Sequence, residues 1–203
     1  MGNHVLLACG MAAGPLFTIA YLAEGAGRVG YRPFRHPVSS LALGRAGWAQ
    51  TVNFLVAGSL SLTFAAGLWR AGPSRGGALL MAVWAVGLLG AGAFRTDPVC
   101  GYPPGTPDQP EHHTRAGALH DLFSLAGFLA LAAACFVCAL SGAAGWTIYS
   151  IASGVLFAAT MALASAAFGG HGRWAHLGGL FQRVSLTIGW TWQTLLAVRV
   201  LYA

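Results

Sequence analysis

The sequence predicts an all-α polytopic membrane protein: a bundle of six transmembrane helices with the longer loops on one face, in a single domain over residues 1–203. Apolar residues make up 56% of the 203 residues, and charged residues make up 8%. A soluble domain usually carries about 25% charged residues. Six stretches stay apolar over the roughly 20 residues that a helix needs to cross a bilayer. These observations exclude an ordinary soluble domain.

The first predicted span covers residues 5–23. It is interpreted as a membrane helix and not as a signal peptide, because no basic segment precedes it. Gly10 and Gly14 form a pair of small residues on one helix face, which can let a neighbouring helix approach closely. Such pairs also arise by chance in a chain with 29 glycines, so a helix contact there is one of two interpretations.

The second and third spans, residues 50–69 and 77–94, are continuous apolar runs. Barrel strands would instead alternate apolar and polar residues over about 10 positions. Pro98 follows the third span and is expected to stop that helix, since proline has no backbone N–H to donate. Asp97 would then lie at the membrane boundary, either as a helix-end acid paired to an arginine or as one member of an acid/base set.

The fourth, fifth and sixth spans cover residues 119–140, 145–168 and 180–201. Pro110 suits the first position of a helix and Glu111 suits its first turn, so the fourth helix is expected to begin outside its apolar run. None of the six spans carries an acidic residue in its middle. All six are therefore compatible with the hydrocarbon core of a bilayer.

An even number of spans places both termini on one side of the membrane. The opposite side, here called the loop-rich face, carries the three longer loops and every acidic residue. It also carries eight of the eleven arginines, and this excess predicts a cytoplasmic location for it. The acidic residues are Glu24, Asp97, Asp108, Glu111 and Asp121.

The candidate catalytic residues are acid and base types at the loop-rich face, namely His36, Asp97, His120 and Asp121. A carboxyl group near lipid can donate a proton, and a histidine can act as a base or as a metal ligand. A metal site would need His120 to be joined by ligands from other loops, such as His36 and Asp97. The sequence therefore leaves the metal and any cofactor unknown.

The first long loop contains His36 and an apolar run, and it is expected to form a short interfacial helix. Pro37 restricts His36 to an extended conformation, and Ser39 or Ser40 could cap that helix. Two interpretations are open. The loop is either part of a site or an anchor in the membrane interface, with arginines on lipid phosphates and Trp48 in the aromatic belt.

The substrate-binding candidates include arginines available for a phosphate group. Two helices also begin at the loop-rich face with a similar pattern, a glycine followed three residues later by Gln50 or Gln182. A helix N-terminus favours an anion, although the same pattern can serve helix packing. The full set of candidates is Arg35, Ser40, Arg45, Gln50, Gln182 and Arg183.

Five short motifs carry a resemblance to a known family. They are His36-Pro-Val-Ser-Ser-Leu, Gly47-Trp-Ala-Gln50, Thr96-Asp-Pro, Gly101-Tyr-Pro-Pro-Gly and His120-Asp121-Leu. With them the chain resembles, over nearly its whole length, the bacterial membrane-protein family called domain of unknown function 998. The resemblance implies six spans in a bacterial plasma membrane, motifs clustered at one face and no established activity. Ala116 stands one turn before His120, where a second histidine would be sought, which disfavours a two-histidine metal site.

Three functions remain open. The first is a membrane-embedded enzyme that hydrolyses, transfers or cyclises a lipid or isoprenoid substrate at the loop-rich face. The second is a non-catalytic scaffold or partner subunit. The protein could form a homo-oligomer under the first or the second function. The third is a transporter, which needs polar residues at the bilayer midplane. Membrane lipids are the expected partners, and the net charge of +6 does not indicate nucleic acid because it lies on the flanks of membrane helices.

The transporter hypothesis has few residues to support a continuous ion path. Hydroxyl and amide side chains inside membrane helices more often bond within or between helices. The available residues are Asn53, Ser59, Ser61, Thr63, Ser150, Ser153, Thr187, Thr191, Gln193 and Thr194.

Overall fold

The computed structural model describes residues 2–71, 74–110, 112–171 and 173–202, which form six long α-helices and two short 3-10 helices. No β-strand occurs within these ranges, and the all-α prediction is confirmed. The elements are α1 (Asn3–Gly27), η1 (Val38–Ala42), α2 (Gly47–Ala71), α3 (Arg75–Ala93), α4 (Arg115–Ala139), α5 (Ala144–Phe168), η2 (Ala175–Leu177) and α6 (Gly178–Leu201).

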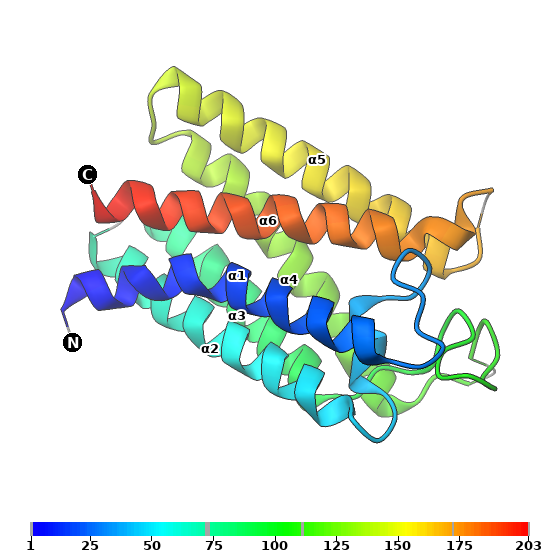
Figure 1. Ribbon diagram of the computed structural model, residues 1–203. Helices are drawn as coiled ribbons and strands as arrows, with labels where there is room; N and C mark the ends of the chain where they lie inside the picture. Colours follow the sequence, from blue (N-terminus) through cyan, green and yellow to red (C-terminus); the bar gives the residue numbers. More distant parts are fainter. Residues whose placement is uncertain (1, 72–73, 111, 172, 203) are drawn as a thin grey trace.

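The helices form a closed ring in which each packs against the next in sequence and α6 returns to α1 (Figure 1). The N- and C-termini lie at one end of the bundle. Loops 28–46, 94–114 and 169–177 lie at the opposite end. The predicted arrangement, with the longer loops on one face, is therefore confirmed.

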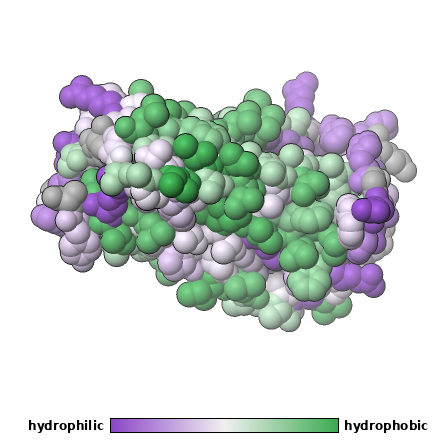
Figure 2. All heavy atoms as spheres, turned by 90° about the horizontal axis from the view of Figure 1, so that it is seen from above, coloured by the Kyte–Doolittle hydropathy of each residue, from purple (hydrophilic) through white to green (hydrophobic). Residues whose placement is uncertain are grey.

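The surface of the bundle fits a multi-pass membrane protein. Figure 2 shows apolar side chains across the middle of the face that it displays and hydrophilic ones at both ends. Five long helices, all except α6, are apolar and long enough to cross a membrane. α6 carries more polar residues but packs between α1 and α5. Large apolar side chains also face outward, as they do where a bundle contacts lipid, among them Ile19, Leu129 and Ile148.

The C-terminus of α3 differs from the prediction. The helix ends at Ala93, before Pro98, so the expectation that Pro98 stops it is wrong. Phe94 is already extended, with φ −110° and ψ 128°. The carbonyl groups at a helix C-terminus lack partners within the helix, and here those of Ala91 and Phe94 lie against the His120 ring. The end of α3 is thus part of the environment of His120.

The N-terminus of α4 also differs from the prediction. The helix begins at Arg115, where the Thr114 hydroxyl accepts a hydrogen bond from the Gly117 N–H at 2.9 Å. α4 therefore begins before its apolar run of residues 119–140, as expected, but Pro110 lies outside the helix and its prediction as the first helical position is wrong. A capping hydroxyl satisfies a backbone donor, whereas proline only presets its own φ angle. Glu111, predicted for the first turn, lies outside the described residues.

The Gly10 and Gly14 pair does mark close helix packing. A Cβ atom at Gly10 would lie 2.5 Å from the Phe64 ring of α2. One at Gly14 would lie 2.8 Å from Cβ of Trp190 in α6. α1 therefore packs tightly against both of its neighbours, which confirms the helix-contact interpretation of this pair.

Gln193 of α6 joins four helices inside the bundle. Its Oε1 accepts a hydrogen bond from Trp84 Nε1 at 3.0 Å. Its Nε2 donates to the carbonyl of Gly10 at 3.3 Å and to Ser61 Oγ at 3.2 Å. Two of the polar side chains considered for an ion path are thus used in bonds between helices, as is common inside membranes.

Candidate functional site

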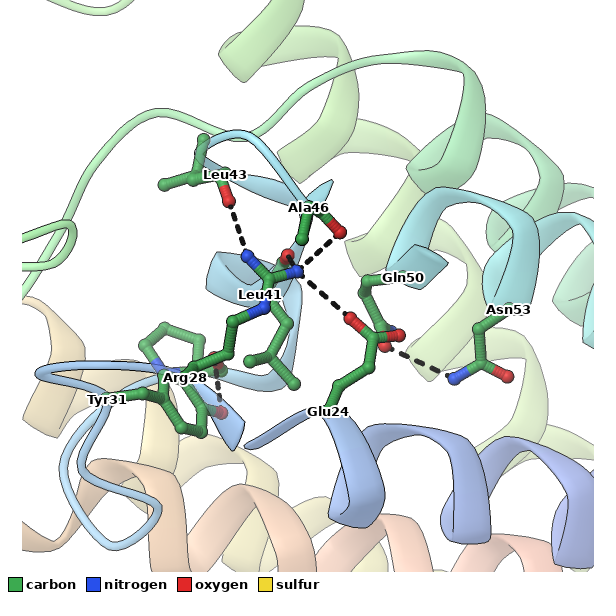
Figure 3. Close-up of polar contacts among 9 residues, drawn as sticks. Glu24, Arg28, Tyr31, Leu41, Leu43, Ala46, Gln50 and Asn53 are labelled. Carbon is green, nitrogen blue, oxygen red and sulfur yellow. Dashed lines mark hydrogen bonds and ion pairs between the residues drawn. The ribbon is translucent and has the colours of Figure 1, made fainter. Parts of the chain in front are cut away.

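Loop 28–46 is fastened to the bundle by arginine side chains, beginning with Arg28 at the end of α1. Its guanidinium donates to the carbonyls of Leu41 at 2.9 Å, Leu43 at 3.2 Å and Ala46 at 2.6 Å (Figure 3). It also pairs with Glu24 at 3.1 Å. Backbone carbonyls in a loop need such donors, so Arg28 acts as an internal support for the loop.

Arg183 of α6 supports the same loop from the other side. Its guanidinium donates to the carbonyl of Pro33, to that of His36 at 3.2 Å and to that of Gly179 at 2.9 Å. It also donates to the Tyr31 hydroxyl at 2.6 Å. Both terminal nitrogens of the guanidinium are thus used, whereas its buried Nε has no partner among the described residues. Arg183 was predicted to bind substrate, and in the structure it holds the loop.

The other two predicted arginines, Arg35 and Arg45, lie in the same loop. Arg35 donates to the carbonyl of Cys100 at 3.1 Å and pairs with Asp108 at 2.7 Å, which joins the first long loop to the second. Arg45 lies in the same loop and is exposed. Arg35 and Arg183 both lie close enough to His36 for their charges to act on it, and both are bonded to loop carbonyls.

His36 is enclosed by loop residues. Its Nδ1 accepts a hydrogen bond from the Arg32 N–H at 2.9 Å. Its ring packs against Tyr31 and Tyr102, with centroid distances of 5.5 and 5.2 Å. Burial, with a smaller contribution from the Arg35 charge, lowers the pKa of His36 below its usual range. The neutral ring therefore carries its proton on Nε2, and it lies apart from the other predicted catalytic residues.

The predicted short helix in this loop exists as η1, but its cap differs from the expectation. Pro37 occupies the N-cap position, so the expectation that Ser39 or Ser40 caps the helix is wrong. The backbone N–H of Val38 instead donates to Gln182 Oε1 of α6 at 2.8 Å. A side chain from another helix thus satisfies the donor that a capping serine would take. Ser40 is fully buried, and its hydroxyl has no partner among the described residues.

The two glutamines of the repeated pattern both serve packing at this point. Gln182 anchors η1, as described above. Gln50 is fully buried and its Oε1 accepts a hydrogen bond from Asn53 at 3.2 Å (Figure 3). Asn53 also donates to the carbonyl of Phe17 in α1 at 3.1 Å. These bonds support the packing interpretation of the pattern, and the buried Nε2 of Gln50 has no partner among the described residues.

A cavity of about 540 Å³, here called the central cavity, lies inside the bundle and reaches the loop-rich face. Its volume falls within the range of about 300–1,000 Å³ that is typical of small-molecule sites. All six long helices contribute to its lining, which is mainly apolar along the helices and polar near the loops. The apolar part includes Phe54, Trp84, Leu88, Phe128, Phe157 and Met161.

The polar end of the central cavity is formed by Asp97, His113, His120 and Asp121. Three of the four predicted catalytic residues therefore line one cavity, and His36 does not. Of the six predicted substrate-binding residues, Gln182 alone lines it within the described part of the chain. The structure thus brings together a smaller acid and base set than the sequence suggested.

His120 is buried one and a half turns into α4, and its hydrogen bonds define its tautomer. Nδ1 lies 3.0 Å from both the Ala91 and the Phe94 carbonyl oxygens. Carbonyls only accept hydrogen bonds, so Nδ1 carries the proton in the neutral ring. No hydrogen bond to Nε2 is found among the described residues, which leaves its lone pair available. This is the form that a general base or a metal ligand needs.

Asp97 lies at the start of α4 and accepts two hydrogen bonds from Thr114. The Thr114 N–H donates to Oδ2 at 2.9 Å and its hydroxyl donates to Oδ1 at 2.7 Å. Oδ2 is also 3.8 Å from Nδ1 of His113. A carboxylate at a helix N-terminus is stabilised by the helix dipole. Asp97 therefore positions α4, and within the described ranges it pairs with no arginine.

Asp121 follows His120 on α4 and has a different environment. Its side chain is exposed where it lines the cavity. It forms no ion pair with another described residue. No group of three or more His, Cys, Asp or Glu side chains able to hold a metal ion is found in the described ranges. The polar end therefore offers acid and base groups without a preformed set of metal ligands.

Sequence reasoning missed the role of two residues at this end. His113 lies in the loop before α4, with its Nδ1 3.8 Å from the Asp97 carboxylate. Gln109 donates from Nε2 to the carbonyl of Phe168 at 2.6 Å, which ties the second long loop to the end of α5 beside the cavity. Threonine is a common N-cap residue, so Thr114 could have corrected the start of α4. No sequence signal indicates the contact of Gln109.

The comparisons with known proteins agree with the resemblance stated above. A family model described as "Protein of unknown function (DUF998)" matches residues 11–199. No curated protein and no solved structure matches the chain. Because the family model covers nearly all of the chain, the protein belongs to the DUF998 family of proteins of unknown function.

Proposed function

We propose that the protein is an enzyme of the bacterial plasma membrane that acts on a lipid bound in the central cavity. The observation that carries this proposal is the division of the cavity into an apolar part and a polar end. An amphiphilic molecule has the same division, with a chain that prefers the bilayer core and a head that prefers the interface. The cavity volume of about 540 Å³ suits part of one such molecule.

The walls between α4 and α5 support delivery from the bilayer. Leu125 and Leu129 of α4 line the cavity and are 56% and 62% exposed. Ala158 and Ala162 of α5 also line it and are exposed. In Figure 1, α4 and α5 diverge from their short connection toward the loop-rich end. Side chains that line a cavity and also face outward mark the route by which a lipid chain reaches it sideways.

The chemistry assigned to this site is proton transfer at the polar end. Nε2 of His120 would accept a proton from a water molecule or a lipid hydroxyl, which then acts as the nucleophile. The His120 imidazolium would then return this proton to the leaving group as its bond breaks, while the neighbouring Asp121 carboxylate stabilises the positive charge of the ring. This assignment fits hydrolysis or group transfer. A non-catalytic lipid-binding subunit is the alternative, with the same cavity and no turnover.

The test uses the protein in lipid nanodiscs with a bacterial lipid extract, followed by mass spectrometry of the lipids. Wild type is expected to consume one lipid class, and His120→Gln is expected to slow this by about 10²–10⁴-fold, the usual contribution of a general base. His176→Gln, which changes an exposed histidine of η2 outside the cavity, is the matched control. A lipid that binds but is never consumed would favour the non-catalytic subunit.

A further inference from the structure

The charges at the polar end of the central cavity are unusual for a lipid site. Asp97 and Asp121 both line it. The lining groups that can become positive are His113 and His120, and no arginine lines the cavity in the ranges that the structure describes. The chain also contains no lysine. The polar end therefore carries acids without a permanent cation to balance them.

The arginines of the loop-rich face are used elsewhere or lie outside the cavity. The guanidinium groups of Arg28 and Arg183 are bound to loop carbonyls, and that of Arg35 is bound to a carbonyl and to Asp108. Arg95 and Arg115, which flank the ends of α3 and α4, are exposed and do not line the cavity. Arg and Lys are the usual side-chain donors to a phosphate, and neither lines this cavity in the described part of the chain.

The polar groups that do line the cavity include several acceptors. Asp97 is fixed as an acceptor by the two donors of Thr114. Asp121 has no ion-pair partner among the described residues, and the hydroxyls of Ser39 and Ser124 lie nearby on the lining. Acceptors bind hydroxyl donors and repel a phosphate, since like charges at short range cost free energy.

We infer that the lipid of this cavity has an uncharged, phosphate-free head that carries hydroxyl groups. The inference rests on the proposed function, because it names the substrate class for the same site. A head hydroxyl donates to the Asp121 carboxyl group or gives its proton to His120. The apolar remainder of the molecule lies along the walls formed by Phe128, Phe157 and their neighbours.

The test compares two lipids that differ only in the phosphate. Wild type in detergent micelles is titrated with dioleoylglycerol or with dioleoylphosphatidic acid, and bound lipid is counted by native mass spectrometry. Dioleoylglycerol is expected to bind at least about tenfold more tightly. Equal or tighter binding of the phosphatidic acid overturns the inference, and so does a lack of binding by both lipids.

Two variants of one exposed residue sharpen the result. Asp121→Asn removes an acid and is expected to reduce the preference for dioleoylglycerol over dioleoylphosphatidic acid. Asp121→Lys supplies the missing cation and is expected to increase the affinity for dioleoylphosphatidic acid. Asp121 is exposed, so neither change disturbs the core. If both variants keep the wild-type preference for dioleoylglycerol, the polar end of the central cavity does not select the lipid head, which would overturn the inference.

Binding is measured here without turnover, which separates the inference from the proposed catalysis. His120→Gln is expected to retain the preference for dioleoylglycerol, because the Asp97 and Asp121 acids remain. A clear preference combined with no consumption of any lipid would leave the head assignment intact and contradict the enzyme. Consumption of a phosphate-bearing lipid would support the enzyme and overturn the head assignment.

Discussion

His36 and His120 lie at the same face of the bundle, but their surroundings give them opposite tautomers. Both rings are buried, with 3% and 4% of their surface exposed. Nδ1 of His36 accepts from the Arg32 N–H, which places its proton on Nε2. Nδ1 of His120 donates to backbone carbonyls, which leaves Nε2 without a proton. The first ring is held between two tyrosines, and the second lines the central cavity.

The same contrast separates the two regions as a whole. At loop 28–46, Arg28 and Arg183 donate hydrogen bonds to loop carbonyls, and Gln182 accepts one from a loop N–H group. At the polar end of the central cavity, Asp121 and one nitrogen of His120 keep capacity to bind a ligand. Residue type is therefore a poor guide to a site, because what matters is whether the protein already uses the hydrogen bonds of the group.

The largest stability effect that this comparison predicts is at Arg183. Arg183→Met should lower the free energy of unfolding by about 2–3 kcal/mol, because it removes a charged donor from the partly buried carbonyl of His36 and from the Tyr31 hydroxyl. Unfolding in SDS, starting from one detergent, measures the change. Arg45→Met is the matched control: this arginine lies in the same loop and is exposed, so its loss should stay within about 0.5 kcal/mol.

Equal losses at Arg183 and Arg45 would contradict the division into a fastened loop and an open cavity. A second measurement tests whether Arg183 also contributes to substrate binding. Arg183→Met that remains folded should bind dioleoylglycerol as wild type does, since Arg183 does not line the cavity.

The general fold was predictable from the sequence because membrane crossing leaves a strong signal. Long apolar runs with no central acid specify helices, and an even number of them places both termini on the same side of the membrane. The helix ends were less predictable. Pro98 and Pro110 suggested where α3 ends and α4 begins, whereas the structure places these ends at Ala93 and Arg115. The carbonyls at the end of α3 contact the His120 ring, and the Thr114 hydroxyl caps the start of α4.

The candidate site was predictable only in part. His120 and Asp121 are adjacent in sequence, and Asp97 follows the helix before them, so these three could be expected to lie close together. The separation of His36 depends on contacts with Tyr31 and Tyr102, which lie in two different loops. Which acceptors each arginine bonds depends on which backbone carbonyls the folded loop exposes to it, and the sequence pattern of a single chain does not predict that.

The next effect in size concerns the route between α4 and α5. Ala162→Trp places a large ring on a residue that lines the central cavity and faces outward, so lipid binding should fall by about tenfold. Ala159→Trp adds the same ring to an exposed position of α5 that does not line the cavity, and binding should stay at the wild-type level. Native mass spectrometry with dioleoylglycerol measures both.

Identical binding and identical rates of lipid uptake in Ala162→Trp and Ala159→Trp would show that the lipid neither occupies the cavity beside Ala162 nor enters between α4 and α5. Access would then come from the loop-rich face, beside the bond between Gln109 and the Phe168 carbonyl. Gln109→Ala removes that bond. It should increase the rate of lipid uptake if the lipid enters from the loop-rich face, and it should leave the rate unchanged if the lipid enters between α4 and α5.

The smallest effect is the pH dependence that His36 gives to loop 28–46. Its pKa in the folded protein is lowered by burial and by the Arg35 charge, so the unfolded chain binds the proton more readily. The stabilisation is therefore complete above the ordinary histidine pKa of about 6.5 and is lost as the pH falls through the lower folded value. His36→Asn keeps an acceptor for the Arg32 N–H but cannot titrate. Thermal unfolding between pH 8 and pH 5 should therefore show a steeper loss of stability for wild type than for His36→Asn, and parallel curves would mean that His36 is protonated without disturbing the loop.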